Sequence, residues 1–520
     1  MAGDAQPSPN SMPRGGASAA RPAGRSRLPD AMTQKTDRAR WIALLVLCAG
    51  TLMIVLDTTI VNVALPTIKR SLGFSQASLA WVVNGYLLTF GGFLLLGGRL
   101  GDLFGPRRLF MAGIVLFTLA SLACGLADSQ AMLVGARVVQ GFGGATVSAV
   151  SLALTMSLFV EQSERAKAMG IFGFVAAGGG TVGVLAGGIL TDLLSWHWIF
   201  LVNVPIGACV CALALPLLPE GTRAGSDTRL DVGGAVSVTA ALMLAVYAIV
   251  NGNQAGWTSA ETLGLLGGAV VLLAVFLTIE SRVRSPLMPL DLFKLRNVAT
   301  ANGLGVLWAA ALFAWFFLSA LYLQLVLHYT PLKVGLAFLP ANLIMGALSL
   351  GISAQLVIRF GLKRPLVVGL TLAGAGLLLF SRAGVGGHFV ADVLPAMILI
   401  GFGGGIVFNP MLLAAMGDVD PSESGLASGL VNTAFMMGGA LGLAILASTA
   451  ASRTSSLLAA GHSHAAALVG GYQLAFLIGA LFAFLAAVVA AIGVRSGTTM
   501  PAMVDEPVVA PSKALAESSV

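Results

Sequence analysis

The chain has 520 residues, of which 57% are hydrophobic, only 10% are charged and 65 are glycines. Soluble globular proteins carry about 25% charged residues, so the composition excludes a soluble protein and indicates one that crosses a membrane many times. Lys and Arg outnumber Asp and Glu by 29 to 22. No basic run with interleaved aromatic residues occurs, so we predict no nucleic-acid partner.

Apolar runs of spanning length follow one another between two polar tails. The tails, residues 1–40 and 496–520, are expected to be disordered and cytoplasmic. Since the lipid interior offers no hydrogen-bond partners, the apolar runs should be helices. They number fourteen and lie near 42–64, 77–98, 108–127, 131–158, 167–190, 198–218, 231–251, 262–281, 298–327, 333–357, 364–382, 389–414, 424–450 and 467–494. The first run is too long for a signal peptide and is expected to stay uncleaved.

The distribution of Lys and Arg predicts the orientation. With the N-terminus inside and the spans alternating, 23 of the 29 cations fall inside, five fall outside and Arg137 lies within a span. Cations accumulate in cytoplasmic loops. The chain is therefore predicted to be an all-α, multi-pass protein of the cell membrane with fourteen helices and both termini in the cytoplasm.

A short internal repeat suggests how these helices are grouped. Residues 103–109 read LFGPRRL and residues 359–365 read RFGLKRP, and each has a glycine turn followed by two cations. Parallel repeats of this kind build many transporters from two halves. We predict six-helix bundles at 41–220 and 298–495, two inserted helices at 231–281 and a cytoplasmic interfacial linker at 282–297.

Two ionisable residues lie inside the predicted spans. A charge at the bilayer centre costs about 2.5–3.5 kcal/mol on insertion scales. Asp57 lies about 10 Å from the outer end of its helix, and Arg137 is expected at a similar depth. They should face one cavity, either paired directly or coupled through water. The pair could act as a proton switch, or it could be a static ion pair that locks two helices.

Three further patterns are open to two interpretations. Gln140, Gly141 and Gly144 share a helix face with Arg137, where they could serve a polar site or close packing. Gly179, Gly183 and Gly187 recur every fourth residue and would let another helix approach closely. The loop at 98–108 holds an acid among cations, which could form a gate latch or only anchor the topology.

Several of these stretches resemble a known family. The chain from about 41 to 495 is similar to the fourteen-helix drug:proton antiporters of the major facilitator superfamily. The resemblance is carried by LDTTIVNVALP (56–66), GRLGDLFGPRR (98–108), RVVQGFGGA (137–145) and WHWIFLVNVPIG (196–207). It departs from the family pattern at Val184, which replaces a proline, at His197, which replaces an arginine, and at Phe435 and Met436, which replace arginine and glutamine.

The resemblance implies roles for the matching positions. Asp57 would take part in proton coupling, with Arg137 and Gln140 in the proton-relay region. The inner gate would comprise Gly98, Asp102, Gly105, Arg107 and Arg108. The antiporter motif would include Gly179, Gly183, Gly187 and Gly188.

Aromatic, methionine and amide side chains could line a substrate cavity. Such a lining suits a bulky, lipophilic organic compound, although the aromatic residues could instead face lipid. The candidates are Asn84, Tyr86, Trp308, Trp315, Gln324, Asn342, Asn409, Asn432, Phe435 and Met436.

These features predict a secondary active exporter of a lipophilic, antibiotic-like compound in exchange for protons. No phosphate-binding loop suggests an ATP-driven pump, and no cofactor, metal or second subunit is predicted, so a monomer in the lipid bilayer is expected. A proton-coupled or facilitated importer of a small organic solute remains the alternative. A membrane sensor or enzyme has little support, since no catalytic cluster lies within the spans.

Overall fold

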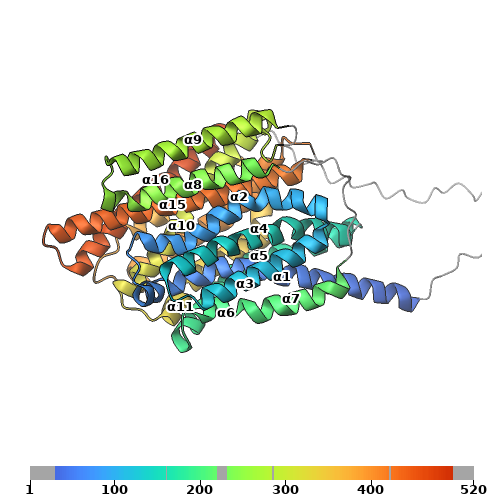
Figure 1. Cartoon of the computed structure of the whole chain (residues 1–520), viewed down its shortest axis with the longest axis horizontal. Helices are drawn as coiled ribbons and strands as arrows, with labels where there is room; N and C mark the ends of the chain where they lie inside the picture. Colours follow the sequence, from blue (N-terminus) through green and yellow to red (C-terminus); the bar gives the residue numbers. More distant parts are fainter. Residues whose placement is uncertain (1–29, 160, 219–230, 284–285, 421–422, 496–520) are drawn as a thin grey trace, which may run out of the picture.

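The computed structural model describes residues 30–159, 161–218, 231–283, 286–420 and 423–495. These residues form helices joined by short loops, and no strand occurs among them. The helices lie side by side along one long axis (Figure 1). The first and last described residues lie at the same end of the bundle, which is called here the terminal end and includes Asp30, Arg282 and Val494. The other end of the bundle is called the opposite end and includes Leu72, His197 and Ala460.

The helices fall into three successive sets. The first comprises α1 (Asp30–Leu72), α2 (Trp81–Phe104), α3 (Pro106–Gly125), α4 (Gln130–Leu158), α5 (Gln162–Leu193), α6 (Trp198–Leu201) and α7 (Asn203–Leu217). The second comprises α8 (Val232–Ala255) and α9 (Ala260–Arg282). The third comprises α10 (Arg296–Leu325), α11 (Pro331–Ala347), α12 (Ser353–Phe360), α13 (Lys363–Phe380), α14 (Leu394–Met416), α15 (Ser424–Ala459) and α16 (His464–Gly493). Short 3₁₀ helices cover Ser78–Ala80 and Leu290–Lys294, and short π-helical segments cover Leu348–Ile352 and Phe389–Val393.

Thirteen helical segments of the described chain are long and apolar enough to cross a membrane. Two of them are composite, since α6 and α7 form one segment and α11 and α12 form another. The helix α5 is not among the thirteen, although it has 32 residues and packs along α1 and α11. The helix α1 begins at Asp30, so residues 30–40 are helical and not part of a disordered tail. These residues contain no glycine or proline to stop the helix.

The first and third sets repeat the same pattern of helix contacts. In the first set α1 packs on α4, α5 and α7, and α3 packs on α4 and α7. In the third set α10 packs on α14, α15 and α16, and α13 packs on α14 and α16. The turns that join α2 to α3 and α12 to α13 match as well, because Gly105 and Gly361 have φ angles of 89° and 75°. A left-handed conformation favours glycine at both places.

The two sets meet along a few helices. The helix α5 contacts α11, α2 contacts α15, and α1 contacts α10. At the opposite end Gln324 of α10 donates to the Val63 carbonyl of α1 at 2.7 Å. The hairpin of α8 and α9 lies outside these contacts, with α8 against α2 and α15 and with α9 against α8. Figure 1 shows this hairpin along one edge of the bundle.

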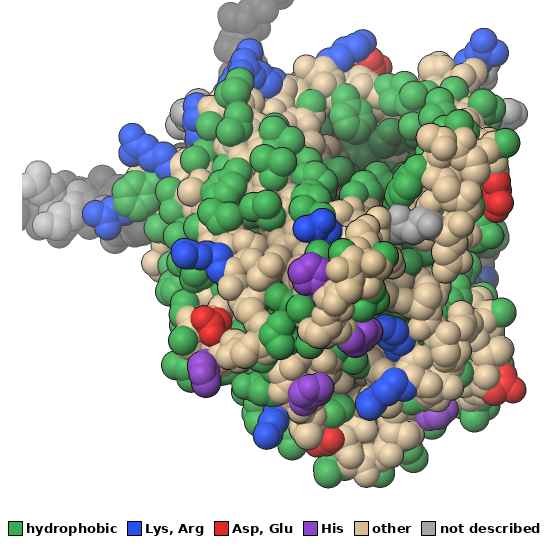
Figure 2. Space-filling model, turned by 90° about the vertical axis from the view of Figure 1, so that its left-hand side faces the viewer, with side chains coloured by type: hydrophobic (Ala, Val, Ile, Leu, Met, Phe, Trp, Pro, Cys, Tyr) green, Lys and Arg blue, Asp and Glu red, His purple; other side chains and the backbone are tan. Residues whose placement is uncertain are grey.

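Charged and imidazole side chains gather at the two ends of the bundle. All five histidines are in loops or at helix starts at the opposite end, namely His197, His328, His388, His462 and His464. Figure 2 shows histidine side chains among apolar and basic ones on this end. Between the ends, most side chains that point outward are apolar, as a lipid-facing surface requires.

The glycines of α5 allow a close approach to α1. A Cβ on Gly187 would lie 2.6 Å from the Ile60 carbonyl oxygen, and one on Gly183 would lie 2.9 Å from the Leu56 carbonyl oxygen. Both obstacles are backbone atoms, which cannot rotate away. By contrast, a Cβ on Gly178 of the same helix would meet nothing within 4 Å.

We therefore predict that Gly187→Ala destabilises the protein by about 1–3 kcal/mol, the usual cost of overpacking. The matched control Gly178→Ala should be neutral or stabilising, since alanine is the better helix former. Thermal unfolding of the two purified variants in one detergent checks this. Equal unfolding temperatures for both variants would contradict the close-approach role of Gly187.

Candidate functional site

A buried ion pair joins α1 to α4 inside the first set of helices. Asp57 and Arg137 are 0% and 1% exposed, and Arg137 Nη1 lies 2.5 Å from Asp57 Oδ2. Sequence analysis left open whether the two groups pair directly or through water, and the structure brings them into direct contact. Two charges buried this deeply are stable only if their remaining hydrogen-bonding groups also find partners.

Amide side chains complete the coordination of Asp57. Gln140, one helical turn after Arg137, donates from Nε2 to Asp57 Oδ1 at 2.8 Å and accepts from Arg137 Nη1 at 2.8 Å. Asn203, at the start of α7, donates from Nδ2 to the same Asp57 oxygen at 3.3 Å. The carboxylate thus accepts three side-chain hydrogen bonds, so both of its oxygens have partners.

Ser121 of α3 links these amides to the backbone. Its hydroxyl oxygen accepts from Gln140 Nε2 at 3.2 Å and from Asn203 Nδ2 at 3.0 Å. The hydroxyl itself donates to the Phe200 carbonyl at 2.9 Å. We call Asp57, Arg137, Gln140, Asn203 and Ser121 the polar network. It draws one or more side chains from each of α1, α3, α4 and α7.

Aromatic rings enclose the guanidinium of Arg137. Its Cζ lies 4.5 Å from the centroid of the Tyr86 ring and 5.6 Å from that of Phe200. Arg137 Nε also donates to the Val82 carbonyl at 2.9 Å. Ring faces attract a cation, more strongly where water is excluded. Arg137 is therefore held by α2 and α6 as well as by Asp57.

Two polar atoms at the edge of this network have no partner. They are the Tyr86 hydroxyl and Asn203 Oδ1. Buried polar atoms without partners are rare and mark places where water or another group can bind. Cys124 of α3 closes another edge, with its thiol sulfur 3.6 Å from Gln140 Oε1.

Sequence analysis missed three members of this site, Ser121, Asn203 and Phe200. Asn203 and Phe200 stand inside the stretch 196–207 that carries the family resemblance, and an amide in an apolar run was the available signal. Ser121 had no comparable signal, because serine is common in membrane helices, where it often bonds to its own backbone.

The predicted antiporter glycines lie beside this site. Gly179, Gly183 and Gly187 face α1 between Leu52 and Ile60, on either side of Asp57 along that helix. Gly188 instead faces α11, where a Cβ would lie 2.8 Å from the Pro331 carbonyl oxygen. The glycine face of α5 therefore connects the helix of Asp57 to the third set of helices.

The predicted gate residues surround the turn at the terminal end of α2. Gly105 provides the left-handed turn, and a side chain at Gly98 would meet nothing within 4 Å. Arg107 donates to the Leu215 carbonyl of α7, and Arg108 is exposed. The side chain of Asp102 lies outside the described residues. The gate role stays a prediction.

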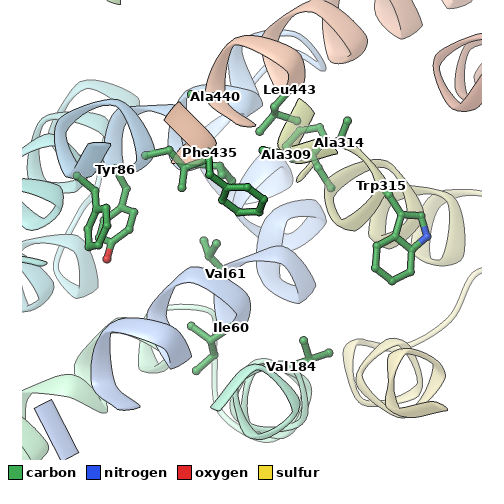
Figure 3. Packing of buried hydrophobic residues seen from close by; sticks show 14 of the residues in the cluster. Ile60, Val61, Tyr86, Val184, Ala309, Ala314, Trp315, Phe435, Ala440 and Leu443 are labelled. Carbon is green, nitrogen blue, oxygen red and sulfur yellow. The ribbon is translucent and has the colours of Figure 1, made fainter. Parts of the chain in front are cut away.

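Three of the predicted cavity residues, Tyr86, Phe435 and Met436, lie on α2 and α15, which pack against each other. Figure 3 shows Tyr86 and Phe435 among packed buried side chains that include Val61 of α1. The Tyr86 hydroxyl is directed to α4, where a Cβ on Gly144 would lie 2.8 Å from it. Met436 also faces α2, since a Cβ on Gly91 would lie 3.1 Å from the Met436 Cβ. The Phe435 ring contacts Phe313 of α10 at 5.8 Å between centroids.

The other predicted cavity residues are dispersed. Trp308 and Trp315 are each 1% exposed, so they do not face lipid, and Trp315 packs on Phe338 at 5.4 Å between ring centroids. Asn409 and Asn432 donate to backbone carbonyls of Ser349 and Ser428. Both amide atoms of Asn84 and Nδ2 of Asn342 are buried without a partner. These contacts do not gather the ten residues into one site.

A groove of about 520 Å³ lies away from all of these residues. It is lined by Ser381, Arg453, Gly470, Gln473, Leu474 and Leu477. These positions belong to α15, α16 and the loop after α13 near the opposite end. None of the predicted site residues borders it.

His197, where the family pattern has arginine, lies in the loop before α6. Burial lowers the pKa of its imidazole, and its ring stacks on Trp196 at 3.9 Å between centroids. Burial therefore disfavours the charged form of His197, whereas the arginine of the family pattern is always charged.

Comparison with known proteins places the chain in a family. A model of the Major Facilitator Superfamily matches residues 47–443. The puromycin resistance protein pur8 of Streptomyces alboniger is 39% identical over 455 residues, which cover 87% of this chain and 90% of the relative. The cephamycin export protein CmcT of Amycolatopsis lactamdurans is 38% identical, with 83% and 89% covered. The lincomycin resistance protein of Streptomyces lincolnensis is 37% identical, with 82% and 87% covered.

Solved structures agree on the fold. A bacterial homologue of the human lysosomal transporter Spinster, in an inward-facing and unoccupied conformation, has a TM-score of 0.61 at 15% identity and covers 88% of this chain and 97% of its own. An auto-inhibited peptide transporter of the POT family has a TM-score of 0.60 at 17% identity, with 86% and 96% covered. The chain therefore belongs to the major facilitator superfamily, is a multi-pass membrane transporter and not an enzyme, and has antibiotic and multidrug exporters among its relatives.

Proposed function

We propose that the chain exports a lipophilic, antibiotic-like compound across the cell membrane in exchange for protons. The polar network around Asp57 is the observation that carries the proposal, because it places an ionisable carboxylate deep in the helix bundle against a buried cation. The printed names of the relatives, which include resistance and export proteins for several antibiotics, support the substrate class and the direction.

Protonation of Asp57 would change the network in a defined way. The neutral carboxyl no longer attracts Arg137, which then keeps its bonds to Val82 and Gln140 and its contact with the rings of Tyr86 and Phe200. Arg137 becomes a buried cation without an anion, and this state is unfavourable in a low dielectric. A shift of α1 against α4 that admits water or substrate relieves it.

The glycine face of α5 offers a path for this shift. The helix α1 packs on Gly179, Gly183 and Gly187, and the adjacent Gly188 packs on α11. Since these contacts are close and rigid, a movement of α1 displaces α5 and its contact with the third set of helices. Protonation at Asp57 would thereby be coupled to the relative position of the two halves.

Counting α5 as a span gives fourteen, arranged as two six-helix bundles at 41–220 and 298–495 with α8 and α9 inserted between them. The termini and the linker at 282–297 would lie on the cytoplasmic side, where Asp102, Arg107 and Arg108 form the inner gate. The substrate would bind as a single molecule to a monomer, in the region that Tyr86, Phe435 and Met436 border.

We predict that Asp57→Asn removes the dependence of transport on a pH gradient. In proteoliposomes with an imposed gradient, substrate movement should fall by about 5- to 150-fold, the range of a coupling free energy of about 1–3 kcal/mol. The exposed carboxylate Asp192 on α5 provides the control, and Asp192→Asn should retain gradient-driven transport. Full gradient-driven transport by Asp57→Asn would refute the coupling role.

A second experiment separates a proton switch from a static ion pair. Arg137→Gln leaves Asp57 buried without its cation, so we expect a loss of about 3–5 kcal/mol in stability. The double variant Asp57→Asn with Arg137→Gln has no buried charge, and it should recover most of that stability without recovering gradient-driven transport. Recovery of both properties would mean that the pair only locks the helices.

The direction of transport can be tested in cells. Deletion of the chain should raise the accumulation of its substrate and increase sensitivity to it, and a panel of antibiotics of different classes would identify the substrate. Lower accumulation of the compound after deletion would contradict export and favour an importer.

A further inference from the structure

Two carboxylates lie close together at the terminal end of the α8–α9 hairpin. Asp231 precedes the first turn of α8, and Glu280 belongs to the last turn of α9. Their side chains are only 5% and 4% exposed. Neither residue belongs to the polar network, which lies in the first set of helices.

Each carboxylate uses one oxygen to bind a backbone amide. Asp231 Oδ1 accepts from the Gly234 amide at 2.7 Å, and Glu280 Oε2 accepts from the Met288 amide at 3.1 Å. The second oxygens, Asp231 Oδ2 and Glu280 Oε1, are buried and have no hydrogen-bond partner. Buried carboxylate oxygens without a partner mark a place where a small ligand can bind.

The two free oxygens point toward the same place. A Cβ on Gly234 would lie 2.6 Å from Asp231 Oδ2 and 2.9 Å from Glu280 Oε1. Both oxygens therefore border one point beside Gly234, where the absence of a side chain leaves room, and they lie no more than 5.5 Å apart. At such a separation a negative charge on one carboxyl group disfavours a negative charge on the other.

No cation of the described chain balances the two charges. Arg282 of α9 is exposed and Arg99 of α2 is half-buried, and neither forms an ion pair or hydrogen bond with this pair. Glu423, before α15, is exposed, and the side chain of Asp102 is not described. A small apolar cluster adjoins the pair, since it contains Ala235 of α8 and Leu287 of the linker. Leu96 of α2 completes it, and Phe93, Leu95 and Leu100 pack against it.

Two ionised carboxylates cannot be stable together in such surroundings, because burial and mutual repulsion both disfavour the second charge. One bound proton removes this conflict, since the pair then carries a single negative charge. We propose that Asp231 and Glu280 form a proton-binding site that holds one shared proton at neutral pH. The site is distinct from Asp57 and does not depend on the proposed transport function.

The bound proton would fasten three segments to one another. Asp231 caps the start of α8 through the Gly234 amide. Glu280, in the last turn of α9, accepts from the Met288 amide of the linker that leads to α10. Loss of the proton places two negative charges between them and loosens the hairpin from the linker. The proton is taken from solution at the terminal end and returned there.

Infrared spectroscopy of the purified full-length chain in lipid nanodiscs tests the site. At neutral pH the wild-type protein should show a protonated carboxyl band that is absent in Glu280→Gln. In Asp231→Asn, which keeps a side-chain oxygen to cap α8, the band should vanish at a lower pH than in the wild type, because the second charge is gone. Asp291 is an exposed carboxylate that pairs with the exposed Lys294. Its variant Asp291→Asn is the matched control and should leave the band unchanged.

The same band should persist in Asp57→Asn, which separates this site from the polar network. Thermal unfolding gives a second readout: a proton held only in the folded state stabilises it at low pH, and that stability is lost as the pH rises through the titration. Glu280→Gln should lose this dependence.

Two outcomes would overturn the proposal. The first is a wild-type spectrum identical to that of Glu280→Gln at neutral pH. The second is that adding Na⁺ or Ca²⁺ to the wild-type protein abolishes the band and raises the unfolding temperature. That result would mean that the two carboxylates bind a metal cation and not a proton. If Glu280→Gln does not fold, the test is the pH at which the carboxyl band vanishes in the wild type and in Asp231→Asn. The same pH for both proteins would refute a shared proton.

Discussion

The ion pair between Asp57 and Arg137 is the interaction on which the first half of the molecule depends. It puts two charges where water is excluded, and such a pair is tolerated only when nearly every remaining donor and acceptor is matched. Gln140, Asn203 and Ser121 supply those partners from other helices. A shift of any of these helices would break a buried hydrogen bond, so the network fixes how α1, α3, α4 and α7 pack.

Close packing through glycine carries this constraint beyond the network. The backbone of α1 lies directly on the glycine face of α5, and Gly188 continues that face onto α11. Glycine ladders need no specific chemistry and serve packing in many membrane helices. Here the ladder adjoins the one buried ion pair of the described residues, so that packing and proposed proton chemistry share a helix. Val184, in place of the family's proline, is buried within an uninterrupted α5.

The two halves have the same contact pattern but different chemistry. The first half holds the buried ion pair, whereas the corresponding helices of the second half bury Trp308, Trp315 and Phe435. The amides beside them bond to backbone carbonyls or are left unpaired. We interpret this as a division between proton binding in one half and contacts with an apolar compound in the other. The inserted hairpin adds a pair of carboxylates, Asp231 and Glu280, at its own end, and Glu280 contacts the linker between the halves through the Met288 amide.

The sequence by itself determined the helical, membrane-spanning class, the repeat and the approximate helix positions, because hydropathy and backbone satisfaction leave a membrane chain few choices. It also singled out Asp57, Arg137 and Gln140, since charged and amide groups are conspicuous in apolar runs. It could not find Ser121 or the pairing of Asp231 with Glu280: a serine carries no distinctive pattern, and the two acids lie 49 positions apart at helix ends where carboxylates are ordinary. Only the tertiary structure decided which faces meet, whether Trp308 and Trp315 face protein or lipid, and which buried oxygens lack partners, because periodicity gives a helix a face but not a neighbour.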